Sequence, residues 1–414
     1  MKKTLATILS TVCLILVLQG LFFSLPKVGA QSNVISNINV STTWYKANSP
    51  YILTTPLVVD PKATLTIEAG VQVNLNGNYL QADGALIVQG TANETIHLSG
   101  GSIILNSNSK IKNVILSNDL QVIINSGSPE ISDSQVDSRI VVKGGSPKIS
   151  NTIISDGIHA DAIGGPITIE NNRIKSKSGY SVIYIQGIHA NILGNTIEGN
   201  NNCNTGIEVY LLISSASITN NTILHSAVGI HILTGPTNRN DIIENAVFNN
   251  TVGICARGST VVQNNTIAYN EIGLQTEKAN IVSGNNFLSN SRYSLEAVGI
   301  HDIAVTNNWW GTVDNATIDQ MIYDRNDEGV RGQVSYLPVL NKSNPKTPAI
   351  PAENMTPPVS TQPTIPNETR QSWDWAKTTL SIIGVVVLFV VTFALLFFRR
   401  NRKAATFTAT PMAS

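Results

Sequence analysis

The phrase ITNNTI at residues 218–223 recurs, with small changes, through the middle of the chain. Each copy holds an aliphatic residue, two small or polar residues, Asn or a substitute, and then an apolar residue two positions further on. The other copies are ISNTII (149–154), IENNRI (169–174), ILGNTI (192–197), IIENAV (242–247), VQNNTI (262–267), VSGNNF (282–287) and VTNNWW (305–310), with weaker copies IKNVIL (111–116) and ISDSQV (131–136). Their starts lie 18 to 26 residues apart, with a mean near 22, and self-similarity at such a period indicates a solenoid.

The residue types distinguish between two kinds of solenoid. A leucine-rich repeat needs Leu at set positions and a helical stretch in each unit, whereas here the apolar residues are mostly Ile and Val in short alternating runs. These runs are bounded by Gly, Asn and Ser, which is typical of short strands joined by turns. The sequence therefore predicts an all-β parallel β-helix whose recurrent Asn residues hydrogen-bond from coil to coil at a turn.

The two ends of the chain have the composition of targeting and anchoring segments. Residues 1–30 begin with two lysines after Met1 and continue with a long apolar run and small residues at the spacing of a cleavage site, which predicts a secretory signal peptide or, alternatively, an uncleaved signal anchor. Residues 378–398 form 21 positions without charge, long enough to cross a bilayer as one helix. The basic residues in 399–414 predict a cytoplasmic tail, so we expect a single-pass plasma membrane protein with most of the chain outside the cell.

Charge excludes one class of partner. The whole chain balances 27 basic against 27 acidic residues, but residues 31–377 keep all 27 acidic and only 20 basic ones, a net charge of −7. A nucleic-acid-binding protein needs a basic face, so we do not expect a nucleic-acid partner. Cys203 and Cys255 alone remain after the signal segment, which is too few for a disulfide framework.

A segment rich in Pro and Thr, residues 341–377, separates the repeats from the apolar span. Such a composition predicts an extended, unpacked stalk. Exported chains can be glycosylated at N-x-[ST] sequons, and the candidates are Asn341, Asn354 and Asn367 in this segment with Asn93 and Asn315 before it.

A family resemblance becomes specific at the two ends of the repeat region. The segment STTWYKANSPYILTTPLVVDPKATLTIEAGVQV (41–73), the Asn-rich coils and the segment NNWWGTVDNATIDQMIYDRNDEGVRGQVSYLPVL (307–340) resemble the right-handed parallel β-helix proteins of the pectin-lyase-like group. Within that group they are most similar to the surface and periplasmic branch, which includes the NosD-like proteins. The resemblance covers about 300 residues and implies a right-handed β-helix ectodomain over residues 31–340.

The same resemblance implies a cap at the terminal coil. NNWWG marks the last coil in such proteins, so Trp309, Trp310 and Gly311 are expected to cover the exposed end of the core. A cap is physically required, because an open end exposes unpaired strand edges and apolar side chains. The alternative is that the two tryptophans form a platform for a sugar.

Catalytic phrases of the group are missing. Galacturonase-like members carry N-x-D, D-D, G-H-G and R-x-K, and pectate-lyase-like members carry W-x-D-H and R-x-P-x-x-R, but this chain has only the R-x-K of Arg173 and Lys175. Glycoside hydrolysis also needs two carboxylates at a set separation. We therefore predict no catalytic residues and no cofactor, so a non-enzymatic function is expected and an enzymatic function is the alternative.

One outward column was considered as a metal site. When the strand starts are aligned, one residue of each coil lies on the outer face of the solenoid. Among these residues, Glu208, His231 and Cys255 lie on three consecutive coils and are of types that bind metals, so they form a candidate metal site. The full predicted column is His159, Ile183, Glu208, His231, Cys255, Gln275 and Glu296.

An acidic run near the terminal coil lacks the spacing of an EF-hand loop, so it is expected to be a solvated face of the cap. Its members are Asp314, Asp319, Asp324, Asp327 and Glu328.

These observations predict a non-catalytic cell-surface protein that is displayed on a stalk and binds extracellular polysaccharide, an envelope glycan or a surface partner. One alternative is a surface-anchored polysaccharide lyase or glycoside hydrolase. A further alternative is a NosD-like accessory in metal or cofactor maturation.

Overall fold

The computed structural model describes residues 32–34, 36–162, 164–200, 205–210, 214–235, 237–278 and 281–351. The predicted signal (1–30), membrane span (378–398) and tail (399–414) lie outside these residues, as do the sequons at Asn354 and Asn367. No helix within the described ranges is both long and apolar enough to cross a membrane.

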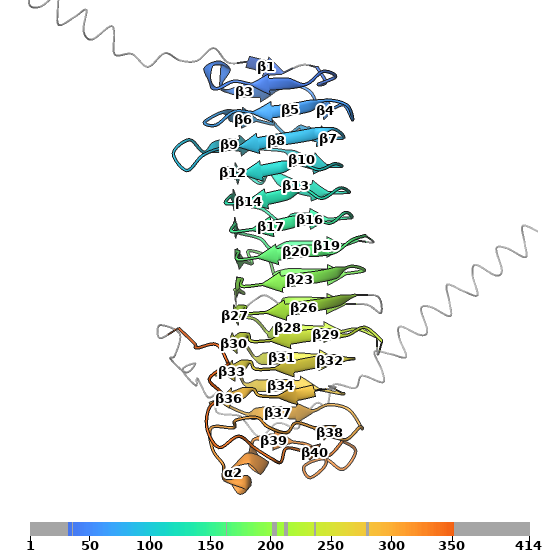
Figure 1. Cartoon of the computed structure of the whole chain (residues 1–414), viewed down its shortest axis with the longest axis vertical. Helices are drawn as coiled ribbons and strands as arrows, with labels where there is room; N and C mark the ends of the chain where they lie inside the picture. Colours follow the sequence, from blue (N-terminus) through green and yellow to red (C-terminus); the bar gives the residue numbers. More distant parts are fainter. Residues whose placement is uncertain are drawn as a thin grey trace, which may run out of the picture. The chain divides into compact units, whose positions relative to one another are not determined.

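The described chain is a parallel β-solenoid with very little helix, as the repeat predicts, and it is consistent with a right-handed β-helix. Three parallel sheets, here called A, B and C, run along it, and each coil adds one strand to each sheet (Figure 1). Sheet A consists of β1 (Ser32–Val34), β3 (Tyr51–Leu53), β6 (Gln72–Asn74), β9 (Ile96–Ser99), β12 (Val114–Ser117), β15 (Gln135–Val136), β18 (Ile153–Ile154), β21 (Arg173–Lys175), β24 (Thr196–Glu198), β27 (Thr222–Leu224), β30 (Ala246–Phe248), β33 (Thr266–Ala268) and β36 (Asn286–Leu288).

The other two sheets follow the same order along the chain. Sheet B consists of β4 (Leu57–Val59), β7 (Tyr79–Ala82), β10 (Ser102–Leu105), β13 (Gln121–Ile124), β16 (Ile140–Val142), β19 (Ile158–Asp161), β22 (Ile183–Gln186), β25 (Thr205–Tyr210), β28 (Val228–Leu233), β31 (Val252–Arg257), β34 (Ile272–Thr276), β37 (Tyr293–Ala297) and β39 (Ile322–Tyr323). Sheet C consists of β2 (Thr42–Trp44), β5 (Thr64–Ile67), β8 (Ala85–Gln89), β11 (Lys110–Lys112), β14 (Glu130–Ser132), β17 (Lys148–Ser150), β20 (Ile167–Glu170), β23 (His189–Leu193), β26 (Ser215–Thr219), β29 (Asn240–Ile243), β32 (Thr260–Gln263) and β35 (Ile281–Ser283). A short 3-10 helix, η1 (Lys46–Asn48), lies near the start, and α2 (Asn315–Gln320) and the pair β38 (Ile303–Ala304) and β40 (Val334–Ser335) lie at the end.

Inward side chains stack on their equivalents in neighbouring coils. In sheet C, Ile192 pairs with Ile218 and Ile218 pairs with Ile242, and all three side chains are fully buried. Burying a side chain of this size contributes about 1.5–3 kcal/mol relative to leaving it in water. The repeated Ile and Val positions therefore supply the main stabilisation of the solenoid.

A buried ladder of asparagines follows the turn between sheets C and A. Asn245 is fully buried, and its Nδ2 donates to Oδ1 of Asn265 in the next coil (3.0 Å) and to the carbonyl of Ile218 in the preceding coil (2.9 Å). Its Oδ1 accepts from both the backbone N–H and the Nδ2 of Asn221, at 2.9 and 3.0 Å. The same side-chain contacts join Asn172, Asn195, Asn221, Asn245, Asn265, Asn285 and Asn308.

A second, shorter ladder follows the turn between sheets A and B. Asn250 donates from Nδ2 to Oδ1 of Asn270 (3.2 Å), and Asn270 donates in the same way to Asn290 (3.2 Å). The repeated sequence phrase does not include these asparagines, and this ladder was not predicted. In both turns the residue before the ladder position has a positive φ, as at Asn264 (54°) and Tyr269 (54°), which lets the chain turn sharply there.

Aromatic residues lie at the end of the core. Trp310 is 1% exposed, and its ring stacks on Phe287 at 4.8 Å between centroids. Trp309 is half-buried and bridges to Asn286 on the edge strand β36, and Gly311 turns the chain with a φ of 81°.

The acidic run near the cap is only partly the solvated face that was expected. Asp324 is 3% exposed, and its carboxylate accepts from the backbone N–H of Val334 (2.8 Å) and from Nε2 of Gln333 (2.9 Å), so it secures the last strand. Asp314 instead caps α2 by accepting from the backbone N–H of Thr317 at 2.9 Å. The prediction was wrong for Asp324, because hydrogen bonds from two nearby donors offset the free-energy cost of burying its carboxylate.

The start of the predicted stalk packs on the outer face of sheet A. Asn344 accepts from the backbone of Lys346, and its own N–H donates to Oδ1 of Asn286 (2.8 Å). Thr266 donates from Oγ1 to the carbonyl of Pro348 (2.6 Å). Residues 341–350 are therefore not the unpacked segment that their Pro content predicted. Their last residue, Ile350, is buried against an outward apolar cluster of Leu224, Ala246, Phe248 and Ala268.

The described sequons Asn93, Asn315 and Asn341 are exposed.

Replacing Asn245 by Ala should lower the free energy of unfolding by about 3 kcal/mol. The change leaves two donors of Asn221 without their acceptor, and each buried unsatisfied group costs about 1–3 kcal/mol. The matched change Asn220→Gly should be nearly neutral, because Asn220 is exposed with a φ of 56°, which Gly adopts freely. Chemical denaturation followed by circular dichroism measures both, and an equal loss in the two variants would contradict the role given to the ladder.

Candidate functional site

The outer face of sheet B carries one continuous column of chemically active side chains. Glu208, His231 and Cys255 occupy paired positions on β25, β28 and β31, and Gln275 and Glu296 continue the line on β34 and β37. Each follows an inward, fully buried Ile or Leu, so alternation along the strand turns it outward.

One member of the predicted column was wrong. Ile183 is fully buried and pairs with the inward residues Ile158 and Ile207, whereas Tyr184 takes the outward position between His159 and Glu208. Two consecutive apolar residues at the start of this strand, Val182 and Ile183, are both buried, so the alternation could not be read from the sequence alone.

Glycines set the direction of these strands. Gly253 precedes the inward Ile254, and a Cβ at Gly253 would lie 2.6 Å from the carbonyl oxygen of Gly273 and 2.8 Å from Nδ2 of Asn270. Any larger residue would therefore push the strand away from the second Asn ladder. The glycines before Ile207, Ile230, Ile254 and Leu274 thus hold this part of the column on the outer face.

The centre of the column is a connected group of three side chains. Oε1 of Glu208 lies 3.8 Å from Nδ1 of His231, and His231 and Cys255 are direct partners on the neighbouring strands β28 and β31. Ser181 donates from Oγ to the other carboxylate oxygen of Glu208 at 2.5 Å. Glu208 and His231 are each about one quarter exposed, and Cys255 is 5% exposed.

The interactions within this group shift its titration. The neighbouring side chains of Cys255 and Glu208 raise the pKa of His231 to about 9. His231 in turn lowers the pKa of the Glu208 carboxyl. His231 is therefore a cation and Glu208 an anion near neutral pH.

A metal site does not follow from this arrangement. Within the part of the chain that the structure describes, no group of three or more His, Cys, Asp or Glu side chains is placed to hold a metal ion. Glu208, His231 and Cys255 lie on consecutive coils, but they do not form such a ligand set.

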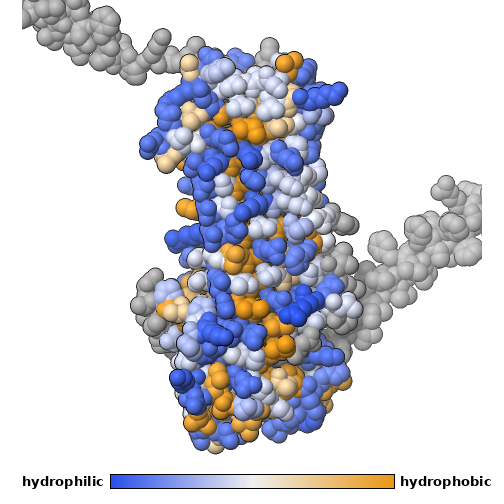
Figure 2. Space-filling model, viewed as in Figure 1, coloured by the Kyte–Doolittle hydropathy of each residue, from blue (hydrophilic) through white to orange (hydrophobic). Residues whose placement is uncertain are grey.

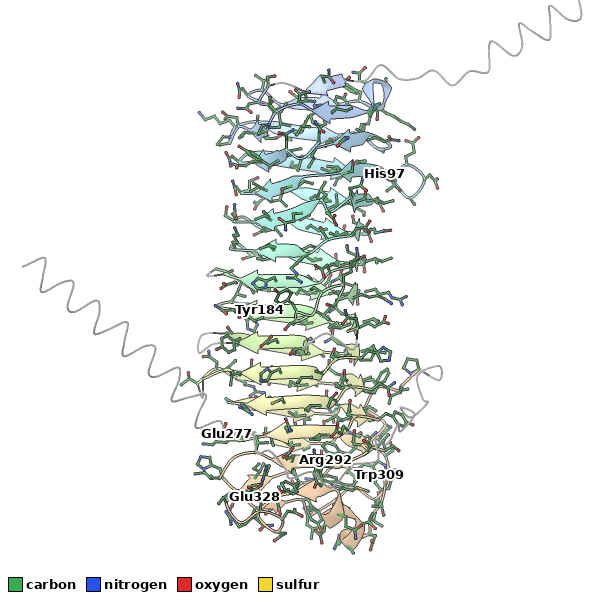
Figure 3. The ribbon with its side chains drawn as sticks, turned by 180° about the vertical axis from the view of Figure 1, so that it is seen from behind. His97, Tyr184, Glu277, Arg292, Trp309 and Glu328 are labelled. Atoms are coloured by element: carbon green, nitrogen blue, oxygen red, sulfur yellow. The ribbon has the colours of Figure 1, made fainter. Side chains whose placement is uncertain are left out.

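An aromatic pair extends the column toward the N-terminal coils. The rings of His159 and Tyr184 stack at 4.7 Å between centroids, and Tyr184 donates from its hydroxyl to Oε1 of Gln186. Burial lowers the pKa of His159, with the positive charge of Arg139 adding to the effect, and burial raises the pKa of Tyr184. Figure 3 shows Tyr184 near the middle of the solenoid. Tyr184 was not among the predicted column residues, because Ile183 was placed at its outward position.

Charged and aromatic residues close the column at the cap. Gln275 donates from Nε2 to Glu296 (2.8 Å), and Glu296 also pairs with Arg331 at 3.2 Å. The Arg331 guanidinium lies over the ring of Tyr323 at 4.6 Å, and the rings of Tyr323 and Tyr293 are 4.9 Å apart.

The remaining sequence candidates lie elsewhere. Arg173 and Lys175, the isolated R-x-K, are on sheet A and both pair with Glu198, at 3.8 and 2.7 Å. They form a surface ion-pair cluster away from the sheet B column. Trp310 is too deeply buried to offer a sugar platform.

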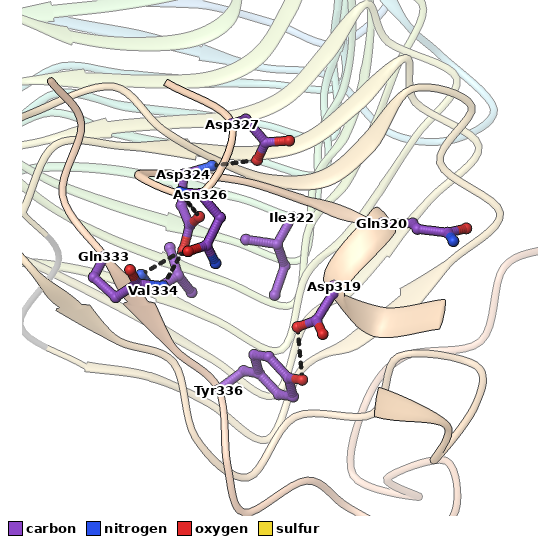
Figure 4. A pocket seen from close by; sticks show the side chains of 9 residues that line it. All are labelled: Asp319, Gln320, Ile322, Asp324, Asn326, Asp327, Gln333, Val334 and Tyr336. Atoms are coloured by element: carbon purple, nitrogen blue, oxygen red, sulfur yellow. Dashed lines mark hydrogen bonds between the residues drawn. The ribbon is translucent and has the colours of Figure 1, made fainter. Parts of the chain in front are cut away.

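A pocket of about 370 Å³ lies at the cap and is lined in part by Asp319, Asp324 and Tyr336 (Figure 4). Its polar groups bond to one another: the hydroxyl of Tyr336 donates to Oδ1 of Asp319 at 2.8 Å, and Asp324 is held by the backbone of Val334. Burial, together with Asp319, raises the pKa of Tyr336 to about 12. This pocket is therefore part of the architecture of the cap.

No family model, curated protein or solved structure matches the chain. The assignment of a role to the sheet B column therefore rests on its own geometry.

The stability of the chain should depend on the charge of His231. Its folded pKa of about 9 lies above the ordinary value of 6.5, so the protonated ring contributes stability that is fully present below pH 6.5 and lost as the pH rises through about 9. We expect the wild-type unfolding free energy to fall over this range by up to about 3 kcal/mol more than that of His231→Gln. Denaturant titrations at a series of pH values measure this difference.

The control is His97→Gln, which changes an exposed histidine on sheet A and should keep the wild-type pH dependence. At acid pH the carboxylate of Glu208 matters instead. Because its pKa is lowered from 4.5, its contribution to the free energy of unfolding is present above pH 4.5 and is lost as the pH falls. Identical alkaline profiles for wild type and His231→Gln would show that the ring gains no proton on folding.

Proposed function

We propose that this chain is an exported β-helix protein of the pectin-lyase-like group whose solenoid binds an extracellular polysaccharide without cleaving it. The repeated phrase and the segments 41–73 and 307–340 support the group. The apolar composition of residues 1–30 and 378–398 supports export and a single membrane anchor.

The observation that carries the proposal is the sheet B column. Neighbouring strands of a sheet lie about 4.8 Å apart, so its members form a regular line along the solenoid. Sugar rings have apolar faces that pack on aromatic rings and hydroxyl edges that hydrogen-bond to carboxylates and amides. Tyr184, Glu208 and Gln275 place both kinds of group on one line, and Tyr210 lies beside that line, in register with Gln186 and Leu233.

The outer faces of sheets A and C are less suited to this task. Their outward charges form cross-strand pairs, such as Lys148 with Glu170 at 2.7 Å and Lys175 with Glu198 at 2.7 Å. Such exposed pairs are well hydrated and give little binding energy. The face drawn in Figure 2 is largely hydrophilic, with smaller hydrophobic patches between the polar residues.

Charge indicates the kind of polymer. Residues 31–377 carry a net charge of −7, and the column itself holds Glu208 and Glu296. Carboxylates repel polyuronates, so a neutral or amino-sugar polysaccharide fits this surface better.

A panel of neutral, amino-sugar and uronic-acid polysaccharides tests the proposal. We expect the purified chain to bind a neutral or amino-sugar polymer, and Tyr184→Ala or Tyr210→Ala to weaken binding about tenfold through loss of a stacking surface. Tyr79→Ala is the matched control, because Tyr79 is an exposed tyrosine of sheet B several coils away from the column's polar members. Absence of binding, or an equal loss in Tyr79→Ala, would overturn the proposal.

One observation favours a second candidate, a polysaccharide lyase. The lowered pKa of His159 favours the neutral imidazole near pH 7, and a neutral imidazole can act as a base. The raised pKa of Tyr184 keeps its hydroxyl protonated, so that it can donate a proton, and the two rings are stacked. A β-elimination needs such a base for the carbon-bound proton and such an acid for the leaving oxygen. Release of unsaturated oligosaccharides by the wild type, lost in Tyr184→Phe, would favour this candidate over binding alone.

A further inference from the structure

An apolar strip continues the sheet B column toward the N-terminal coils. It consists of Ile104, Ile123 and Val141, which are direct partners on β10, β13 and β16. Each is a partly exposed outward residue between two buried neighbours on its own strand. Val141 pairs with His159, whose ring stacks on Tyr184, so the strip leads directly into the aromatic pair. Together these five side chains span four strand spacings, about 19 Å.

A run of polar side chains lies beside the apolar strip. Asn125 donates from Nδ2 to Oδ1 of Asn106 (2.9 Å), and Asn106 donates from Nδ2 to Oδ1 of Asp83 (2.6 Å). Asp83 also accepts from Nε2 of Gln81 (2.9 Å), and Gln81 is the strand partner of Ile104, so the run shares the outer face with the strip. Asn125 is exposed, and its Oδ1 accepts no hydrogen bond from the described part of the chain.

The loop at residues 176–182 borders the other side of the column. Because the strands are parallel, this loop, which precedes β22, lies opposite the amides that follow β10 and β13. The backbone N–H of Ser178 donates to Oδ1 of Asp156 (3.1 Å), and Arg139 donates to Oγ of Ser178 (2.6 Å), so the loop folds back over the two preceding coils. Tyr180 in this loop is 67% exposed, and the guanidinium of Arg139 lies 5.2 Å from its ring centre.

The dimensions of this surface indicate the kind of ligand that fits it. The apolar strip is one side chain wide, whereas a specific protein interface buries about 800 Å² on each partner. An extended polymer that follows the sheet can instead contact each coil in turn. Such a polymer needs small apolar groups for the strip and a hydrogen-bond donor for the polar run. An N-acetylated sugar chain carries both, because each acetamido group has a methyl group and an amide N–H.

We propose that this part of the sheet B column binds an N-acetylated amino-sugar polymer. Acetamido methyl groups pack on Ile104, Ile123 and Val141, an acetamido N–H donates to Oδ1 of Asn125, and a sugar ring stacks on Tyr184. The inference rests on the proposed polysaccharide binding and names the class of polymer. Such a polymer is uncharged, so the net charge of −7 in residues 31–377 does not repel it.

Isothermal titration calorimetry with two neutral hexasaccharides tests the inference. One is the hexamer of chitin, built from N-acetylglucosamine, and the other is the hexamer of cellulose, built from glucose with the same linkage. The two ligands therefore differ only in the acetamido group. We expect the full-length chain to bind the chitin hexamer about tenfold more tightly, which is the effect of removing about two methyl groups from water.

A pair of matched variants locates the site. Ile123→Ser should weaken binding of the chitin hexamer about tenfold and change binding of the cellulose hexamer much less. Ile153→Ser is the control, because Ile153 is 53% exposed on sheet A, and it should bind both hexamers as the wild type does. Thermal melting of each variant shows whether it is folded.

The outcomes separate this inference from the proposed function. Equal affinity of the wild type for the two hexamers, or an equal loss in Ile153→Ser and Ile123→Ser, would overturn the inference and leave polysaccharide binding standing. Self-association of the chain that Ile123→Ser abolishes would assign the strip to a second copy and also overturn it. Binding of neither hexamer, together with no binding in the polysaccharide panel, would overturn both.

Discussion

The constraint on which the whole structure depends is the buried ladder of asparagine side chains at the turn between sheets C and A. The ladder residues are 20 to 26 positions apart in sequence, yet the side-chain contact from one to the next stays at 3.0 Å. Each amide side chain also hydrogen-bonds to backbone groups that the turn would otherwise leave unpaired in the interior. A buried backbone group without a hydrogen-bond partner lowers the stability of the fold. Differences in coil length are therefore taken up elsewhere in the coil, and the ladder keeps the coils in register.

The functional surface follows from that register. Once coils are aligned at the first turn, the shorter ladder from Asn250 to Asn290 and glycines such as Gly253 fix how each chain enters sheet B. A slip of one residue in a strand would turn its outward side chain into the core. The alignment of Glu208, His231 and Cys255 is thus a long-range result of packing at another corner of the solenoid.

Periodicity predicted the parallel solenoid, the inward Ile positions and the Asn contacts, because identical environments repeat in every coil. It failed where one coil departs from the pattern, as at Ile183, where two buried apolar residues hide the alternation. The second ladder was missed although Asn250 and Asn270 each stand three residues before a Gly, which is a signal the sequence does contain. The burial of Asp324 and the packing of residues 341–350 depend on contacts with distant segments, which composition does not encode.

Hydrogen exchange measured residue by residue by NMR tests the central claim most directly. The backbone N–H groups of Asn221, Asn245 and Asn265 lie in turns, and each donates to the side-chain oxygen of the next ladder Asn instead of to a backbone carbonyl of a strand. If the buried ladder holds the coils together, these amides will exchange as slowly as those of the central strands of sheet C. Exchange at the rate of an ordinary turn amide, such as Asn238, would contradict the account.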